Sequence, residues 1–187
     1  REMYRPSAYL VRGDLLADLG LYEAAGKEYQ RVARSNAGDL FALGDLLQRL
    51  ERIGAMNQAL KVSYMMVTVE QERGVPMTLA SFRRMYPTYY WGEISRTAQE
   101  MDLDPNLILA IIRQESAFNE GAISRAGARG LMQVMPATGT YLARKLRLKG
   151  FSVDDLWEAQ TSIRFGSKHL SDHLRYFDGS KDRSLGL

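Results

Sequence analysis

The first part of the sequence repeats itself at a spacing of 34 residues, and this repeat restricts the fold more than any other feature. Four small or apolar residues recur in the same order: Leu16, Leu19, Gly20 and Ala25 return as Leu50, Ile53, Gly54 and Ala59. A period of this length holds one helical hairpin. Turn signals near Gly20, 36–38 and Gly54 divide residues 7–70 into four segments. The sequence therefore predicts four helices arranged as two hairpins.

The pattern Gly20-x-Tyr22-x-x-Ala25-x-x-x-Tyr29 resembles part of the tetratricopeptide repeat, although the second copy has no aromatic residue at the position of Tyr22. About two such repeats are fewer than usually form a stable array. We therefore expect residues 1–75 to be the end of a longer helical solenoid, joined through 72–76 to a second domain over 76–187. Such repeats either bind a partner protein or a glycan, or they only orient the second domain, which we favour.

A strongly apolar helix is predicted to start at Asp104-Pro105 and to end near Glu115. Asp104 suits the N-cap, and Pro105 suits the first turn. The apolar residues recur at helical spacing and share one face: Leu107, Ile108, Ile111 and Ile112. Glu115 lies further along the same face, so we expect its carboxylate on a stripe that points to the core.

A carboxylate on a core-facing stripe is unusual, because an unpaired buried charge is costly. At Glu115, burial and the negative end of the helix dipole would both favour the protonated acid. A glutamic acid that is protonated near neutral pH can act as a general acid. The alternative is that a backbone cap, Arg113 or Arg125 satisfies Glu115, which then has no catalytic role.

The segment after Glu115 is rich in glycine, which lets a backbone take positive φ and approach a ligand closely. Four motifs stand in it in order: Glu115-Ser116, Ala122-x-Ser124-x-x-Gly127-Ala128-x-Gly130, Gly130-Leu131-Met132-Gln133 and Met135-Pro136-x-Thr138. Together they resemble the lytic transglycosylase family, which cleaves bacterial peptidoglycan, in the branch with a soluble-type (SLT) catalytic domain related to goose-type lysozyme.

The resemblance implies an all-α protein in which a lysozyme-like catalytic domain follows an α-superhelical, tetratricopeptide-like segment. It implies cleavage of the β-1,4 bond between N-acetylmuramic acid and N-acetylglucosamine, leaving a 1,6-anhydro-muramoyl end. Glu115 would act alone, first as the acid and then as the base. This agrees with the residues nearby, because Glu120 is expected on an exposed turn and no second acid has a comparable apolar setting.

The resemblance also implies the residues that bind substrate. Ser116 would orient Glu115 or contact a substrate carbonyl, while Gly130, Met132 and Gln133 would line the groove. Gln133 would hydrogen-bond the N-acetyl sugar. Core packing is the alternative role for Met132, and a turn-stabilising amide is the alternative for Gln133.

One expected motif is missing. In the family, an Ala-Tyr-Asn-Ala-Gly-like motif follows the last helix and supplies a Tyr and an Asn, but residues 177–187 contain no such motif. We therefore expect the chain to be a fragment of a longer protein, truncated at its C-terminus. Two other functions stay open: a goose-type muramidase that hydrolyses the bond, and a noncatalytic peptidoglycan-binding scaffold.

Composition excludes several classes of function. The chain has no Cys, so disulfides, thiolate zinc sites and cysteine nucleophiles are ruled out. The net charge of +3 is too small for a nucleic-acid footprint, but it suits an anionic polymer. His169 and His173 share a helix face, yet no third ligand is evident, so neither a metal nor another cofactor is expected.

The expected partners are peptidoglycan glycan strands, with cell-wall proteins as possible ligands of the repeats. The expected location is the bacterial cell envelope, in the periplasm. No apolar run approaches membrane-spanning length, and residues 1–4 show no signal peptide.

Overall fold

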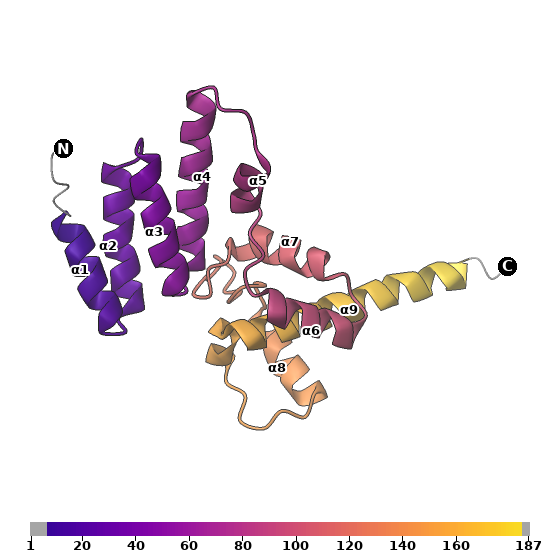
Figure 1. Ribbon diagram of the computed structural model, residues 1–187. Coiled ribbons are helices and arrows are strands. Elements are labelled where there is room, and N and C mark those ends of the chain that lie inside the picture. The colour runs from indigo at the N-terminus through magenta and orange to yellow at the C-terminus, as the bar shows by residue number, and fades with distance from the viewer. Residues whose placement is uncertain (1–6, 185–187) are drawn as a thin grey trace. The chain divides into compact units, whose positions relative to one another are not determined.

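The computed structural model describes residues 7–184 of the 187-residue chain, with side chains described as far as Phe177. This part of the chain is helical and contains two isolated bridges but no β-strand, which confirms the predicted all-α fold (Figure 1). It forms two compact units, of which the first ends at Pro87 and the second begins at Thr88.

The first unit contains the four predicted helices. They are α1 (Ala8–Asp18), α2 (Tyr22–Ser35), α3 (Leu40–Arg52) and α4 (Met56–Glu72). Gly20 and Gly54 both have a φ of +74°, as the left-handed end of a helix requires. Just after them, the Leu21 and Ala55 amides each donate a 2.9 Å hydrogen bond back into the preceding helix. The two helix ends that lie 34 residues apart therefore share the same backbone geometry.

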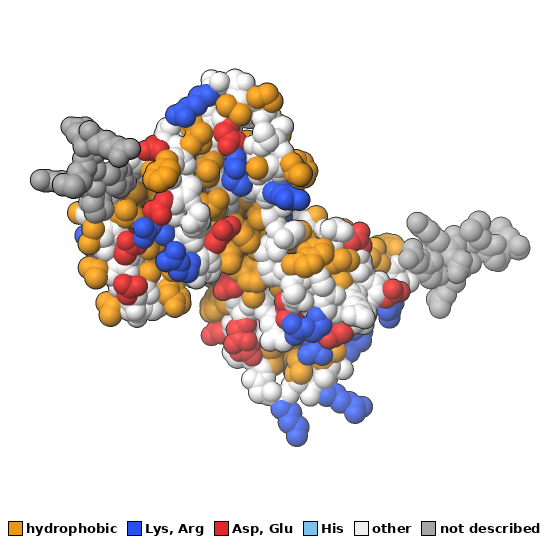
Figure 2. All heavy atoms as spheres, viewed as in Figure 1, with side chains coloured by type: hydrophobic (Ala, Val, Ile, Leu, Met, Phe, Trp, Pro, Cys, Tyr) orange, Lys and Arg blue, Asp and Glu red, His pale blue; other side chains and the backbone are white. Residues whose placement is uncertain are grey.

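The two hairpins are joined by a polar contact around Tyr29. Its buried ring packs beside Gly13, where a Cβ atom would lie 2.6 Å from the ring. Its hydroxyl donates to Asp14 at 2.8 Å, and Arg49 of α3 pairs with the same Asp14 carboxylate. Val11 and Leu15 of α1 and Leu19 just after it are exposed apolar side chains spaced four residues apart. Figure 2 shows hydrophobic side chains, in orange, over α1.

The helix α5 (Leu79–Met85) belongs to the first unit because it packs on α4. Ser81 donates to Glu70 of α4 at 2.7 Å, and Arg84 forms an ion pair with the same carboxylate. The boundary between the units therefore follows Pro87, later than the boundary expected after residue 75.

The second unit contains α6 (Trp91–Met101), α7 (Pro105–Ser116), α8 (Pro136–Lys145), the short 3₁₀ helix η1 (Val153–Trp157) and α9 (Ala159–Ser184). Helix α6 packs against both α7 and α9, and α8 and η1 also lie against α9. Large apolar side chains fill the core of the second unit: Ile94, Ile108, Ile112, Phe118, Leu131, Leu142, Leu156, Ile163 and Phe165. Their burial is the main force that holds α7 in place.

Helix α8 ends at Lys145. The reason is that Arg147 takes a left-handed conformation with a φ of +54°, so the Leu148 amide bonds back to Ala143 at 2.9 Å. Lys and Arg side chains gather around this end of the second unit in Figure 2. No helix among residues 7–184 is long and apolar enough to cross a membrane.

An ion-pair cluster connects α8 to α9. Lys145 of α8 donates to one oxygen of Asp172 at 2.9 Å, and Lys168 pairs with the other. Partial burial alone would raise the pKa of Asp172, but the hydrogen bonds from Lys168 and Lys145 outweigh it and hold that pKa below its ordinary value.

Asp172→Asn is expected to cost about 0.5–1 kcal/mol of unfolding free energy at pH 7. Because the folded-state pKa is depressed, this contribution is fully present above the unfolded-state pKa of about 3.9 and is lost as pH falls through the folded value. Both tryptophans, Trp91 and Trp157, lie in the second unit, so their fluorescence in urea measures the relevant unfolding. The difference in stability between the two proteins should therefore narrow as pH falls below about 3.9, and a difference that stays constant down to the lowest pH at which the unit folds would contradict this assignment.

Candidate active site

Helix α7 begins and packs as the sequence predicts. The Asp104 side chain accepts a hydrogen bond from the Asn106 amide at 2.8 Å, and Pro105 is the first helical residue. Ile108 and Ile112 are fully buried, but Leu107 is 40% exposed and Ile111 is only half-buried, so only part of the predicted apolar stripe faces the core. The helix therefore presents its last turn in a fixed register.

Glu115 is exposed, and the expectation that it is buried in the core is wrong. Its position on the stripe is as predicted, but the packing stops before the last turn, since Ile111 is only half-buried and Gln114 is also exposed. Neither a hydrogen bond nor an ion pair holds the Glu115 carboxylate among residues with described side chains. The carboxylate therefore remains available to a ligand.

Two left-handed residues end α7 directly after Ser116. Ala117 has a φ of +48° and Phe118 a φ of +62°, and such conformations cost roughly 1–2 kcal/mol each outside glycine. The buried Phe118 ring compensates, because it lies 5.3 Å from the Tyr89 ring and 6.5 Å from the Tyr90 ring. These two tyrosines, which directly precede α6, therefore pack against the end of α7.

Hydrogen bonds within the loop after α7 hold it in shape. Ser124 closes its first turn, because its hydroxyl accepts from the Ala128 amide at 3.0 Å and its own amide donates to the Ala128 carbonyl at 3.0 Å. Arg129 and Val134 exchange two further bonds of 3.0 Å. Arg129 also pairs with Asp154 at 2.6 Å and lies over the Trp157 ring, which fixes the loop to η1.

Gly130 and Met132 attach this loop to α9 and η1. Gly130 has a φ of +76°, and a Cβ atom there would lie 2.0 Å from the Leu156 carbonyl oxygen. The Met132 amide donates to the buried Ser162 hydroxyl at 3.1 Å. The Met132 side chain packs on Gly166, where a Cβ atom would lie 2.5 Å away. Close backbone packing is therefore the direct reason for the glycines at 130 and 166.

Gln133 stabilises the turn in which it lies. Its side-chain amide nitrogen donates to the carbonyl oxygens of Ala122 at 3.2 Å and Gly130 at 2.9 Å. Its own φ is +48°. Its Oε1 atom accepts no hydrogen bond from the described residues. Gln133 can therefore serve the turn with its NH₂ group and still offer an acceptor to a ligand.

A groove of about 300 Å³ contains Glu115, which we call the Glu115 groove. Its described lining is Ile111, Glu115, Met132, Gln133, Val134, Met135, Thr138, Gly166, His169, Leu170 and His173. Three predicted site residues, Glu115, Met132 and Gln133, thus meet in one place, and Glu115 is the single acid in this lining. Ser116 and Gly130 do not line it; the Ser116 hydroxyl donates to the Ile112 carbonyl at 3.1 Å.

Part of the lining comes from α8 and α9, and no sequence motif indicated it. His169 and His173 were considered only as metal ligands, yet both face the Glu115 groove beside Thr138. Burial, reinforced by the neighbouring His173, holds the pKa of His169 below its usual value, so this ring is neutral near pH 7. No group of three metal-binding side chains occurs among the described residues.

A model of the transglycosylase SLT domain matches residues 93–186. The soluble lytic murein transglycosylase of Escherichia coli strain K12 is 31% identical over 97 residues, which covers 51% of this chain and 15% of that protein. The protein of the same name from Salmonella typhimurium is 33% identical over 102 residues, with coverage of 51% and 15%. The chain therefore spans about 15% of the length of these relatives.

The solved structures agree in fold. The crystal structure of the 70 kDa soluble lytic transglycosylase from Escherichia coli matches 90% of this chain and 26% of its own, with a TM-score of 0.70 and 22% sequence identity. At this identity the match is evidence of a shared fold alone.

Proposed function

The chain belongs to the transglycosylase SLT domain family, and from this premise we propose that it is a peptidoglycan lytic transglycosylase with Glu115 as its single acid and base. The observation that carries the proposal is the position of Glu115. It lies at the end of a rigidly packed helix, within a groove, with no competing acid in the described lining.

One carboxylate is sufficient for a reaction that consumes no water. Hydrolysis of a glycosidic bond usually requires two carboxylates that flank the sugar. Glu120, the nearest rival, is absent from the Glu115 groove and accepts a 2.8 Å hydrogen bond from the Tyr90 hydroxyl. This arrangement favours an intramolecular reaction over hydrolysis by a goose-type muramidase.

The reaction proceeds in two proton transfers. Protonated Glu115 donates its proton to the oxygen that links the anomeric carbon of N-acetylmuramic acid to N-acetylglucosamine, and that bond breaks. The 6-hydroxyl oxygen of the same muramic acid bonds to the anomeric carbon and gives its proton to the Glu115 carboxylate. The products are an N-acetylglucosamine end and a 1,6-anhydro-muramoyl end, and Glu115 is again protonated.

Substrate binding supplies the dry surroundings that Glu115 lacks in the free protein. A glycan strand in the Glu115 groove displaces water from the carboxylate, which favours its protonated form. Ile111, Met132 and Val134 give that groove apolar walls. The exposure of Glu115 in the free protein is therefore compatible with a role as general acid.

The other proposed site residues act around this carboxylate. Gln133 accepts a hydrogen bond from the N-acetyl group through Oε1, and Met132 forms part of the wall. Gly130 acts indirectly, because it allows the loop to approach η1 and so places both residues. The Ser116 hydroxyl donates its hydrogen to the Ile112 carbonyl oxygen, so its oxygen can still accept a hydrogen bond from a substrate amide.

The first unit is proposed to be a tetratricopeptide-like scaffold that orients the catalytic domain. Its exposed apolar α1 face offers a surface for further helices or for a cell-wall protein. Peptidoglycan as the substrate places the protein in the bacterial cell envelope, on the periplasmic side.

Product analysis tests the proposal. Purified murein is digested with the chain, and the soluble muropeptides are analysed by mass spectrometry. We expect muropeptides with 1,6-anhydro ends, which are lighter by one water than the hydrolytic products. Reducing ends would assign the muramidase activity instead. Binding of murein without any product would assign the noncatalytic scaffold.

A further inference from the structure

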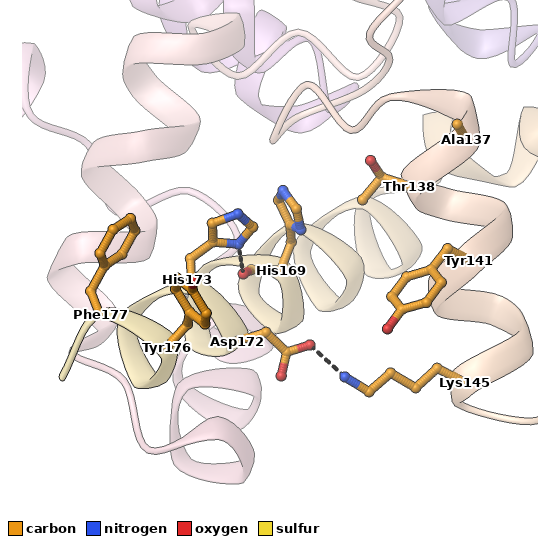
Figure 3. Close-up of a pocket in the computed structure, with 9 residues that line it drawn as sticks. All are labelled: Ala137, Thr138, Tyr141, Lys145, His169, Asp172, His173, Tyr176 and Phe177. Carbon is orange, nitrogen blue, oxygen red and sulfur yellow. Dashed lines mark hydrogen bonds and ion pairs between the residues drawn. The ribbon is translucent and has the colours of Figure 1, made fainter. Parts of the chain in front are cut away.

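The chain is basic and exposed where α8 ends, and we call residues 144–150 the basic turn. It contains no acidic residue and four basic ones: Arg144, Lys145, Arg147 and Lys149. Lys145 reaches across to Asp172 of α9, as Figure 3 shows. The other three are exposed and form no ion pair with the side chains that the structure describes. They are therefore available to an anionic partner.

One face of α9 extends this positive charge. Arg164, Lys168, Asp172 and Arg175 share that face, because they are spaced four, four and three residues apart. Lys168 pairs with the same Asp172 carboxylate as Lys145, which places this face beside the end of α8. Arg164 and Arg175 are exposed and form no ion pair with the described side chains. The basic turn and this face of α9 therefore form one cationic surface.

The basic turn also presents apolar groups between its cations. Leu148 lies between Arg147 and Lys149 and is 40% exposed. Tyr141, one helical turn before Lys145, is 60% exposed, and the Lys145 ammonium lies 5.9 Å from its ring centroid. Apolar side chains surrounded by Lys and Arg are typical of surfaces that lie in the headgroup region of a bilayer, where tyrosine is also enriched.

Backbone and ring contacts hold the basic turn in shape. Arg147 has a φ of +54°, and the Leu148 amide donates to the Ala143 carbonyl at 2.9 Å. Directly after the turn, the Phe151 ring packs 5.2 Å from the ring of the buried Phe165. Because the turn is already ordered, binding through it costs little backbone entropy.

We propose that the basic turn, with the adjoining face of α9, binds the surface of an anionic phospholipid bilayer. The Lys and Arg side chains donate to lipid phosphates, while their alkyl stems and Leu148 lie against the first part of the acyl chains. Murein offers carboxylates to these cations but no apolar layer to Leu148, so the bilayer is the better match. The proposal does not depend on Glu115, since no residue of the basic turn is in the described lining of the Glu115 groove.

Flotation with lipid vesicles measures this binding on the full chain. We expect binding to phosphatidylcholine vesicles that contain about one-third phosphatidylglycerol, no binding to phosphatidylcholine alone, and weaker binding at high salt. Arg147→Gln and Lys149→Gln together should lower the affinity about ten- to thirtyfold, since each basic residue near such a surface contributes about fivefold. Leu148→Gln should lower it about three- to tenfold and leave cosedimentation with murein unchanged.

Arg52→Gln and Lys61→Gln together form the matched control. They remove the same charge from exposed positions of the first unit and should leave vesicle binding within about twofold. Urea unfolding followed by tryptophan fluorescence checks that each variant folds. Equal binding to neutral and anionic vesicles, or unchanged affinity after either basic-turn variant, would overturn the proposal. Loss of murein binding or of muropeptide release after the basic-turn double substitution would assign the turn to the wall polymer and also overturn it.

Discussion

Glu115→Gln is expected to reduce the release of 1,6-anhydro muropeptides at least about 10³-fold, because the amide can neither donate the first proton nor accept the second. The substitution keeps the size of the side chain, so the loss should appear in kcat and not in binding of the strand. Mass spectrometry of murein digests, with product counted over time, gives the rate.

The stability of the variant distinguishes loss of chemistry from loss of fold. The Glu115 carboxylate has no hydrogen bond or ion pair among residues with described side chains, so Glu115→Gln should change the unfolding free energy by less than about 0.5 kcal/mol. Glu120→Gln is the control, since Glu120 is also exposed but lies outside the Glu115 groove. Full activity after Glu115→Gln would reject both enzymatic functions as assigned here.

Gly130→Ala is expected to destabilise the second unit by about 3–5 kcal/mol, a large part of the stability of a typical domain. Two costs add up. An Ala at a φ of +76° is strained by roughly 1–2 kcal/mol, and its Cβ atom would lie 2.0 Å from the Leu156 carbonyl oxygen, so the backbone must move. Urea unfolding followed by tryptophan fluorescence measures the loss.

Gly127→Ala separates the two costs. Gly127 has a φ of +87°, but nothing lies within 4 Å of a Cβ atom built there. The unfolding free energy of this control variant should therefore fall by only about 1–2 kcal/mol, the cost of the left-handed conformation. Equal losses at the two positions would show that contact with Leu156 is unimportant and that loop conformation alone requires Gly130.

Periodicity predicted the helical parts of the fold because burial and helix ends depend on local sequence. The 34-residue repeat placed four helices, and Asp104-Pro105 placed the start of α7. The errors concern domain boundaries, which depend on contacts between residues that are distant in the sequence. Helix α5, for example, joins the first unit through Glu70, so the boundary expected after residue 75 falls after Pro87.

The part of the candidate site that comes from one continuous segment of the chain was predicted correctly. Glu115, Met132 and Gln133 come from a single ordered segment and do meet in a groove. The burial of Glu115 was mispredicted. The spacing of apolar residues shows which face of a helix points to the core, but it does not show how far along the helix other elements cover that face. His169, His173 and Thr138 were missed because only the tertiary packing of α8 on α9 brings them beside α7.

Helix α7 ends abruptly at Ala117 and Phe118, so the direction in which the Glu115 side chain points depends on the exact length of this helix. Each residue added to a helix turns its end by about 100°. An insertion between Ile112 and Glu115 would therefore rotate the carboxylate away from the bound glycan strand. It would also remove the ring contacts of Phe118 with Tyr89 and Tyr90. Natural insertions should thus accumulate in exposed turns and spare this turn of helix entirely.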